Sequence, residues 1–289
     1  MKTSAVILPN GFSINGRPYR NAGLRVPNGN DEIFIKELFP GISAVKRTIF
    51  LLSRCVVELG PKKEVDDNDI RNLTLGDRDA LLLHLRRLTY GERIESVIIC
   101  PKAGCKEKMS LELQIDSLLI PPKRHIREFY QLNKKVNGED YSIEFKLPSA
   151  GDIEAVSDSS VKDSEPASTK LLYRCIRDVK KNGQNLKSGI MLPETVADAI
   201  SRRMAELDTQ SEILLKMTCP ACSFEFIADF DIGDFFLKEL AAHSQDIFRE
   251  VHLLAWNYHW DEKEILTMTR ERRQIYLNIL TEILNTGEH

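Results

Sequence analysis

The sequence has no long apolar run. No stretch approaches the roughly 20 consecutive apolar residues that a membrane-spanning helix needs, so we expect no such helix. The segment 1–9, MKTSAVILP, carries one positive charge and a very short apolar stretch, whereas a secretory signal needs a longer one. We therefore expect a chain that is made and folded in a cytoplasm.

An excess of positive charge is also missing. The 40 Lys and Arg against 43 Asp and Glu give a formal net charge of −3, whereas a general binder of nucleic acid or anionic membranes is normally basic. The sequence contains no Gly-rich phosphate loop, no nucleophile elbow and no open metal triad, so we expect no enzyme. Its 42% hydrophobic and 29% charged residues are typical of a globular protein with a sizeable core.

Cysteines are few, and their spacing indicates metal rather than disulfides. Without a secretory signal or a starved core, six cysteines do not predict a disulfide framework. Cys219-Pro-Ala-Cys222 is a C-x2-C turn between two alternating segments, and Cys100 to Cys105 is a C-x4-C turn in the same context. A tight turn brings two sulfurs to about 2.3 Å from one ion, and each pair supplies half of a tetrahedron.

We therefore predict one structural Zn²⁺ per chain. Four thiolates close the coordination and leave no position for a catalytic water. The alternative is a decayed zinc ribbon whose reduced cysteines bind nothing. The predicted ligands are Cys100, Cys105, Cys219 and Cys222, and the lysines around the turns that could offset the charge of the site are Lys102, Lys106, Lys108 and Lys216.

An internal duplication would bring the two cysteine pairs together. The segment 51–56, LLSRCV, reappears at 171–176 as LLYRCI, and the cysteine pairs begin 45 residues after Cys55 and 44 residues after Cys175. The alternative is coincidence between two Leu-rich helices. We interpret Cys55 and Cys175 themselves as small buried core residues at equivalent positions.

The elements indicate an α+β fold of duplicated helix-plus-zinc-hairpin repeats. Apolar spacing predicts helices over 45–59 and 77–90, and Asn137-Gly138 predicts a hairpin turn. Residues 157–168 have the composition of a mobile loop. The predicted layout is an N-terminal β/turn arm outside the core (1–45), a first repeat (46–120), a β-rich linker with the mobile loop (121–165), a second repeat (166–242) and a C-terminal helical module (243–289).

The C-terminal module has two features that leave alternatives open. Arg270, Arg272 and Arg273 lie in the first turn of the last helix, where cations oppose the helix dipole; they face either an acidic partner or solvent. The aromatic cluster around Trp256 and Trp260 is interpreted as packing, and His252 and His259 as core or capping residues rather than metal ligands. If each cysteine turn bound its own ion, further ligands could come from His84, His125 and His243.

Three segments resemble a known family. Residues 75–86, followed by Gly91 and the first cysteine turn, resemble the baseplate hub proteins and hub assembly chaperones of T-even-type phages, whose relatives occur in contractile injection systems. Residues 145–152 resemble a strand-and-turn motif of the same proteins. Residues 253–273 resemble small proteins encoded beside injection-system baseplates. The C-x4-C turn departs from the usual C-x2-C of the family.

The resemblance implies a non-enzymatic role in building or forming the central hub of a contractile tail. The partners that it implies are other baseplate, spike or tube proteins, and the location is a bacterial host cytoplasm or the assembled tail particle. The alternative function is that of a zinc-ribbon protein that binds nucleic acid. Its support is a basic stretch with aromatic residues at 123–135.

Overall fold

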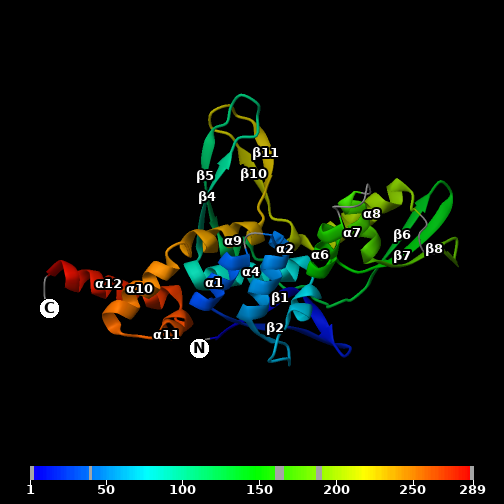
Figure 1. Cartoon of the computed structure of the whole chain (residues 1–289). Coiled ribbons are helices and arrows are strands. Elements are labelled where there is room, and N and C mark those ends of the chain that lie inside the picture. Colours follow the sequence, from blue (N-terminus) through cyan, green and yellow to red (C-terminus); the bar gives the residue numbers. More distant parts are fainter. Residues whose placement is uncertain (1–2, 39–40, 160–165, 187–190, 287–289) are drawn as a thin grey trace.

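The computed structural model describes residues 3–38, 41–159, 166–186 and 191–286. It combines helices with antiparallel sheets, which confirms the α+β class (Figure 1). The first half contains β1 (Thr3–Ile14), β2 (Arg17–Arg25), α1 (Gly29–Leu38), α2 (Ala44–Cys55), β3 (Val56–Leu59), α3 (Asp67–Arg71), α4 (Leu75–Tyr90), β4 (Arg93–Ile99), β5 (Lys108–Gln114) and α5 (Ile115–Leu118).

The second half also contains both helices and strands. It contains β6 (Tyr130–Val136), β7 (Glu139–Phe145), α6 (Ala150–Ser159), α7 (Ala167–Cys175), β8 (Ile176–Lys181), β9 (Gln184–Asn185), α8 (Glu194–Leu207), a 3-10 turn η1 (Thr209–Ser211), β10 (Leu214–Thr218), β11 (Glu225–Asp229), α9 (Ile232–His243), α10 (Ile247–Tyr258), α11 (Glu262–Thr267) and α12 (Arg270–Thr286).

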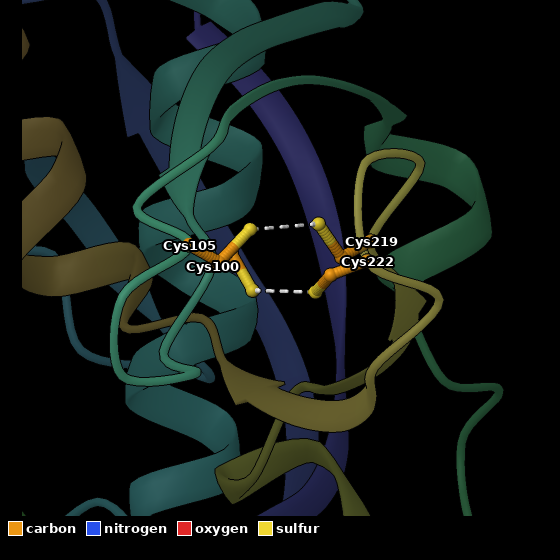
Figure 2. A group of neighbouring side chains, drawn as sticks. All are labelled: Cys100, Cys105, Cys219 and Cys222. Atoms are coloured by element: carbon orange, nitrogen blue, oxygen red, sulfur yellow. Dashed lines mark hydrogen bonds between the residues drawn. The ribbon is translucent and has the colours of Figure 1, made fainter.

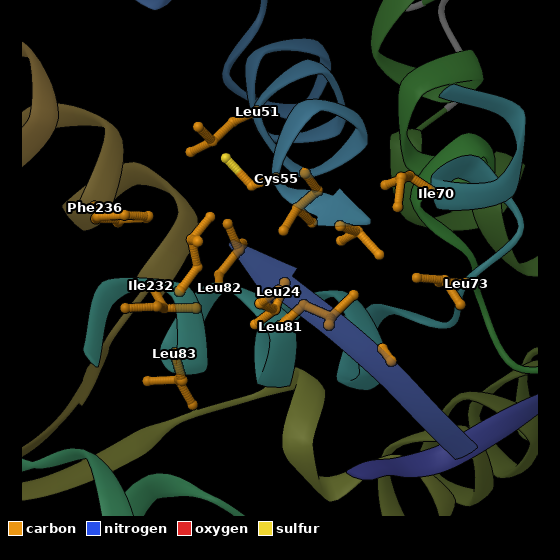
Figure 3. Packing of buried hydrophobic residues seen from close by; sticks show 14 of the residues in the cluster. Leu24, Leu51, Cys55, Ile70, Leu73, Leu81, Leu82, Leu83, Ile232 and Phe236 are labelled. Atoms are coloured by element: carbon orange, nitrogen blue, oxygen red, sulfur yellow. The ribbon is translucent and has the colours of Figure 1, made fainter. Parts of the chain in front are cut away.

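The largest hydrophobic core forms what we name the body, made of β1–β3, α1, α2, α4 and α9. Figure 3 shows Leu24, Leu82 and Phe236 converging in this core from a strand, from α4 and from α9. The helix α9 follows the second cysteine hairpin, in the second half of the chain. The body is therefore closed by segments that lie about 200 residues apart in the sequence.

The expectation that residues 1–45 form an arm outside the core is wrong. Val6, Leu8, Leu24 and Ile35 are at most 5% exposed and belong to the main cluster. The reason is that β1 and β2 form an antiparallel hairpin, whose inward side chains lie on one face of a sheet that α2 and α4 cover.

The predicted helix over 45–59 also ends earlier than expected. α2 ends at Cys55, and the remaining four residues form β3, which pairs with β2 through Leu24↔Val56 and Ala22↔Leu59. Two consecutive β-branched residues, Val56 and Val57, favour a strand once a sheet edge is available beside them. The helix α4, by contrast, ends at Gly91 as predicted.

A second sheet has the order β6-β7-β8-β9 and packs with α7 and α8 around its own core. The hairpin predicted at Asn137-Gly138 is confirmed, because both residues have positive φ and join β6 to β7. The predicted boundaries after 45 and after 165 each run through a sheet, since β2 pairs with β3 and β7 pairs with β8. Residues 160–165 of the expected mobile loop lie outside the described part of the chain.

The helices that follow β2 and β7 have matching buried carboxylates, Asp31 on α1 and Asp152 on α6. Asp31 accepts a hydrogen bond from Nε of Arg54 at 2.8 Å, and Asp152 lies 3.4 Å from Nε of Arg174. Each arginine is the penultimate residue of its helix, α2 or α7. Burial acts to raise both carboxyl pKa values, but hydrogen bonds from neighbouring basic side chains and backbone outweigh it, so that the pKa of each is lowered.

The first residue of α1, after β2, and the first residue of α6, after β7, each donate a backbone hydrogen bond to a carbonyl that lies between two other helices. Gly29 N–H donates to the carbonyl of Met268 at 3.2 Å, just before α12, and Ala150 N–H donates to the carbonyl of Leu73 at 3.1 Å, just before α4. The α11–α12 segment therefore contacts the start of α1 in the way that the α3–α4 segment contacts the start of α6.

Two hairpins project from the body side by side, and we name them the stalk: β4–β5 and β10–β11 (Figure 1). At the base, Ile94 and Ile115 are fully buried in the body core, and Leu215 packs against it. Toward the tip, a separate small cluster contains Met109, the cysteines, Ile98 and Phe226. The stalk therefore has little apolar packing of its own near the cysteine turns.

Candidate metal centre

The four predicted ligands meet at the tip of the stalk. Cys100 follows β4, Cys105 lies in the turn before β5, Cys219 follows β10, and Cys222 lies in the turn before β11. In Figure 2 the two pairs approach each other from opposite hairpins. All four sulfurs lie within 4.8 Å of one another, and this cysteine group is the candidate metal cluster found among the described residues.

The sulfur separations fit one tetrahedral ion. Cys100 Sγ lies 3.8 Å from Cys222 Sγ, and Cys105 Sγ lies 3.7 Å from Cys219 Sγ. Four sulfurs at about 2.3 Å from a central Zn²⁺ are about 3.8 Å apart when the angles are tetrahedral. A disulfide needs about 2.05 Å, and all four cysteines are free. The donor set therefore fits zinc, with each hairpin supplying two thiolates.

Backbone N–H groups also point at the sulfurs. Cys100 accepts from Lys102, and Cys105 accepts from Glu107. Cys219 accepts from the N–H groups of both Ala221 and Cys222. Such donors stabilise thiolate over thiol and fix the direction of the lone pairs that face a metal.

The longer C-x4-C turn reaches the same geometry through its glycine. Lys106 and Ser223, the residues that follow the second cysteine of each turn, have left-handed φ values of 54°. Gly104 has φ +83° and open space around the position where a Cβ would be, so it absorbs the two additional residues of the first turn. The departure from C-x2-C is thus local to residues 101–104.

The thiol pKa values differ strongly across the group. Burial raises the pKa of Cys100 to about 12. Burial acts in the same direction on Cys219, but the N–H donors of Cys222 and Ala221 outweigh it and lower its pKa to about 7. Without a cation, four thiolates this close together would repel one another. A divalent ion is the group that allows all four to ionise together, and its binding releases protons.

The additional histidine ligands considered from the sequence do not join this group. His84 lies on α4 against Arg87, whose Nη2 is 2.8 Å from Nδ1, and burial lowers the pKa of His84 to about 4. The ring of His243 packs 4.8 Å from that of Tyr90, and His125 is exposed on the segment before β6. The lysines that could offset the negative charge of the thiolates are exposed near the turns: Lys102, Lys106, Lys108 and Lys216.

Two interpretations of the C-terminal module need correction. Arg273 is fully buried, and its acidic partners are Glu32 at 2.7 Å and Glu250 at 2.9 Å in the same chain, so it faces neither solvent nor another protein. Sequence reasoning missed this because the partners lie on α1 and α10. Trp260 packs against Tyr258 and Tyr276 as expected, but Trp256 is 74% exposed and does not pack in a core.

A buried polar junction was not foreseen at all. Asn10 donates through its backbone N–H to Asp77 at 2.8 Å and through its side chain to Asp208 at 2.7 Å. Gly76 N–H also donates to Asp208, and a Cβ on that glycine would come within 2.0 Å of the carboxylate. The junction joins β1, α4 and the end of α8. The Gly-Asp pair at the start of a Leu-rich helix is the sequence signal that could have indicated it.

The basic stretch at 123–135 does not present free aromatic rings. Phe129 lies 4.2 Å beneath the guanidinium of Arg177, and Tyr130 stacks on Phe145 at 6.0 Å between ring centroids. Lys123 donates to the carbonyl of Leu207. These aromatic residues are therefore engaged within the protein, whereas binding of single-stranded nucleic acid uses exposed rings.

Comparison with known proteins places the chain in a family. The sequence profile of a family described as T4 bacteriophage base plate protein matches residues 49–237, nearly two thirds of the chain. No curated protein and no solved structure matches. Among the described residues, no helix is long and apolar enough to cross a membrane. The matched range includes both cysteine pairs and most of the body core, and the chain belongs to the T4-type phage baseplate protein family.

Proposed function

We propose that this baseplate protein is a non-enzymatic structural or assembly-chaperone component of the hub of a contractile phage-like tail or injection system, stabilised by one structural zinc. The observation that carries the proposal is the group of four mutually close cysteines at the stalk tip. A closed set of four thiolates would cross-link two segments that lie more than 100 residues apart and would leave no open position on the metal for a substrate.

We also propose that the chain is an internal duplication whose units are longer than 46–120 and 166–242. Each unit would begin with a hairpin, β1–β2 or β6–β7, and continue through two helices, a strand (β3 or β8) and a long helix (α4 or α8) to a cysteine hairpin. The first unit contains α3 in addition, and the second contains β9. The support is the matched pair of buried carboxylates and the position of Cys55 and Cys175, each the last residue of a helix that runs directly into a strand.

The residues 243–289 would form a separate C-terminal module. Its support is a small hydrophobic cluster of α10, α11 and α12 that is distinct from the body core. Arg273 would attach the module to the body through Glu32. The partners would be other baseplate, spike or tube proteins, and assembly would take place in the host cytoplasm, with the chain retained in the finished tail or released from it.

Affinity purification of the tagged chain from its native host, followed by mass spectrometry, tests the proposed function. Recovery with spike, tube or wedge proteins of a contractile tail is the expected result. Recovery with nucleic acid and without tail proteins would instead support the zinc-ribbon alternative and would contradict the proposal. Electron microscopy of particles from a strain that lacks the gene should show tails without a complete hub.

A further inference from the structure

The stalk has an outer surface that the zinc centre does not use. On β4, Val97 is 61% exposed and Ile99 is 56% exposed, although both are aliphatic. Cross-strand pairing places Ile99 opposite Lys108 and Val97 opposite Ser110. An edge strand with exposed aliphatic side chains is a place where another chain can add as a further strand.

The backbone of the same strand is also unpaired on one side. Each stalk hairpin is a separate two-stranded sheet among the described residues, so β4 has a hydrogen-bonded neighbour on one edge only. Cys100 N–H donates to the carbonyl of Glu107. Because hydrogen-bonded positions alternate in an antiparallel ladder, the N–H and C=O groups of Val97 and Ile99 point away from β5. These groups are free to pair with an added strand.

The charges along this face differ from base to tip. At the base, Arg93 pairs with both Glu95 at 2.8 Å and Glu112 at 3.1 Å, which leaves this half with a net negative charge. Toward the tip, Lys106 and Lys108 are exposed and have no ion-pair partner among the described residues. Glu107 pairs with Cys100, so alternation directs its side chain to the opposite face. The tip half of the face is therefore aliphatic and cationic.

We propose that this face binds an extended, acidic segment of a neighbouring baseplate protein, which adds to the free edge of β4 as a further strand. Its backbone pairs with Val97 and Ile99, its aliphatic side chains cover theirs, and its carboxylate meets Lys108. Strand addition of this kind takes affinity from the main chain and specificity from alternate side chains. The inference rests on the proposed function, since it names the partner chemistry of a baseplate component.

The second hairpin provides a matched control. Ile227 on β11 is also 61% exposed and lies opposite Lys216. On that hairpin, however, Glu225 and Asp229 share the outer face with Ile227, so that face offers no excess of positive charge to an acidic partner. A change at Ile227 alters an equally exposed isoleucine in the same type of strand.

The test uses the full-length chain in native particles. A zero-length carbodiimide joins lysine amines to carboxylates, and mass spectrometry of treated particles should find Lys106 or Lys108 linked to Asp or Glu of another tail protein. The double variant Val97→Thr/Ile99→Thr keeps strand propensity and should lower recovery of the chain in particles about tenfold. Lys108→Glu should act in the same direction, whereas Ile227→Thr should stay within about twofold of the wild type. Zinc content and melting temperature should match the wild type in Val97→Thr/Ile99→Thr and in Ile227→Thr, which change neither a cysteine nor a lysine near the turns.

Other results overturn the inference in identifiable ways. Unchanged recovery of Val97→Thr/Ile99→Thr, an equal loss for Ile227→Thr, or stalk cross-links to nucleic acid or to a second copy of this chain would each reject it. If wild-type chain is present in tail assemblies but its cross-links avoid the stalk, the inference alone fails. If wild-type chain is never found with tail proteins, the proposed function fails first.

Discussion

The body and the stalk reach stability by different means. The body buries a large set of aliphatic and aromatic side chains from both halves of the sequence, including Leu24, Leu82 and Phe236. The tip of the stalk buries only Met109 and two of its cysteines, with a few half-buried neighbours. A two-stranded hairpin is marginal on its own, so the tip needs a cross-link where the body does not. A zinc shared by the two hairpins would provide it.

The largest expected effect comes from breaking the stalk site. Cys219→Ser removes one thiolate, and structural zinc binding contributes on the order of 10 kcal/mol that is present only in the folded state. We expect the outer parts of β4–β5 and β10–β11 to lose hydrogen-exchange protection together, because each hairpin holds half of the ligands. Protection in α4, which lies in the body core, should remain. Simultaneous loss in α4 would show that the stalk and the body are not separate.

The converse experiment weakens the body. Leu82→Ala truncates a fully buried leucine in the main core and should cost about 2–5 kcal/mol. Its chemical denaturation midpoint should fall, while zinc content in native buffer stays at the wild-type level because no ligand is changed. Loss of zinc from this variant under native conditions would show that the body determines the metal geometry.

Mild acid should weaken zinc binding in the stalk but stabilise the body. Protons compete with zinc for the thiolates, so zinc retention in the stalk should fall as the pH drops from 7.5 to 5. In the body, burial raises the pKa values of Asp77 and Asp79 to about 6, above their usual value of 3.8. The folded state therefore holds protons more tightly, and this stabilises the body as the pH falls from 6 to 4, by on the order of 2 kcal/mol for each carboxyl.

Hydrogen exchange and zinc release, measured together across that pH range, check this prediction. Asp77→Asn should remove part of the pH dependence of the body and leave zinc release unchanged. Asp31 and Asp152 have lowered pKa values and act in the opposite sense, but only as the pH falls through and below 3.8. Parallel loss of zinc and of body protection between pH 6 and 5 would contradict the separation.

The smallest expected effect concerns a cysteine outside the site. Cys55 is fully buried in the body core, and burial raises its pKa well above its usual value. Cys55→Ala should cost about 1–2 kcal/mol, as ordinary core truncations do, with full zinc content. Thermal melting of Cys55→Ala beside Cys219→Ser gives the comparison directly, and equal small shifts would show that the four clustered cysteines are not a structural site.

Local chemistry allowed part of this molecule to be predicted. The cysteine turns, the alternation around them, the turn at Asn137-Gly138 and the end of α4 at Gly91 all depend on neighbouring residues, and each was found. The parts that were missed depend on distant partners. Val56 extends a sheet only because β2 lies beside it, and Arg273 is buried only because Glu32 reaches it from α1. No local pattern carries that information.

If one zinc is shared by both hairpins, the zinc content per chain has a single expected value. Elemental mass spectrometry of protein purified without chelator should give one zinc per chain. The variant Cys100→Ser/Cys105→Ser leaves the second cysteine pair intact and should give nearly none, because half a tetrahedron binds the ion poorly. A wild-type content near zero, a content of two, or retention of zinc in the double variant would contradict the account.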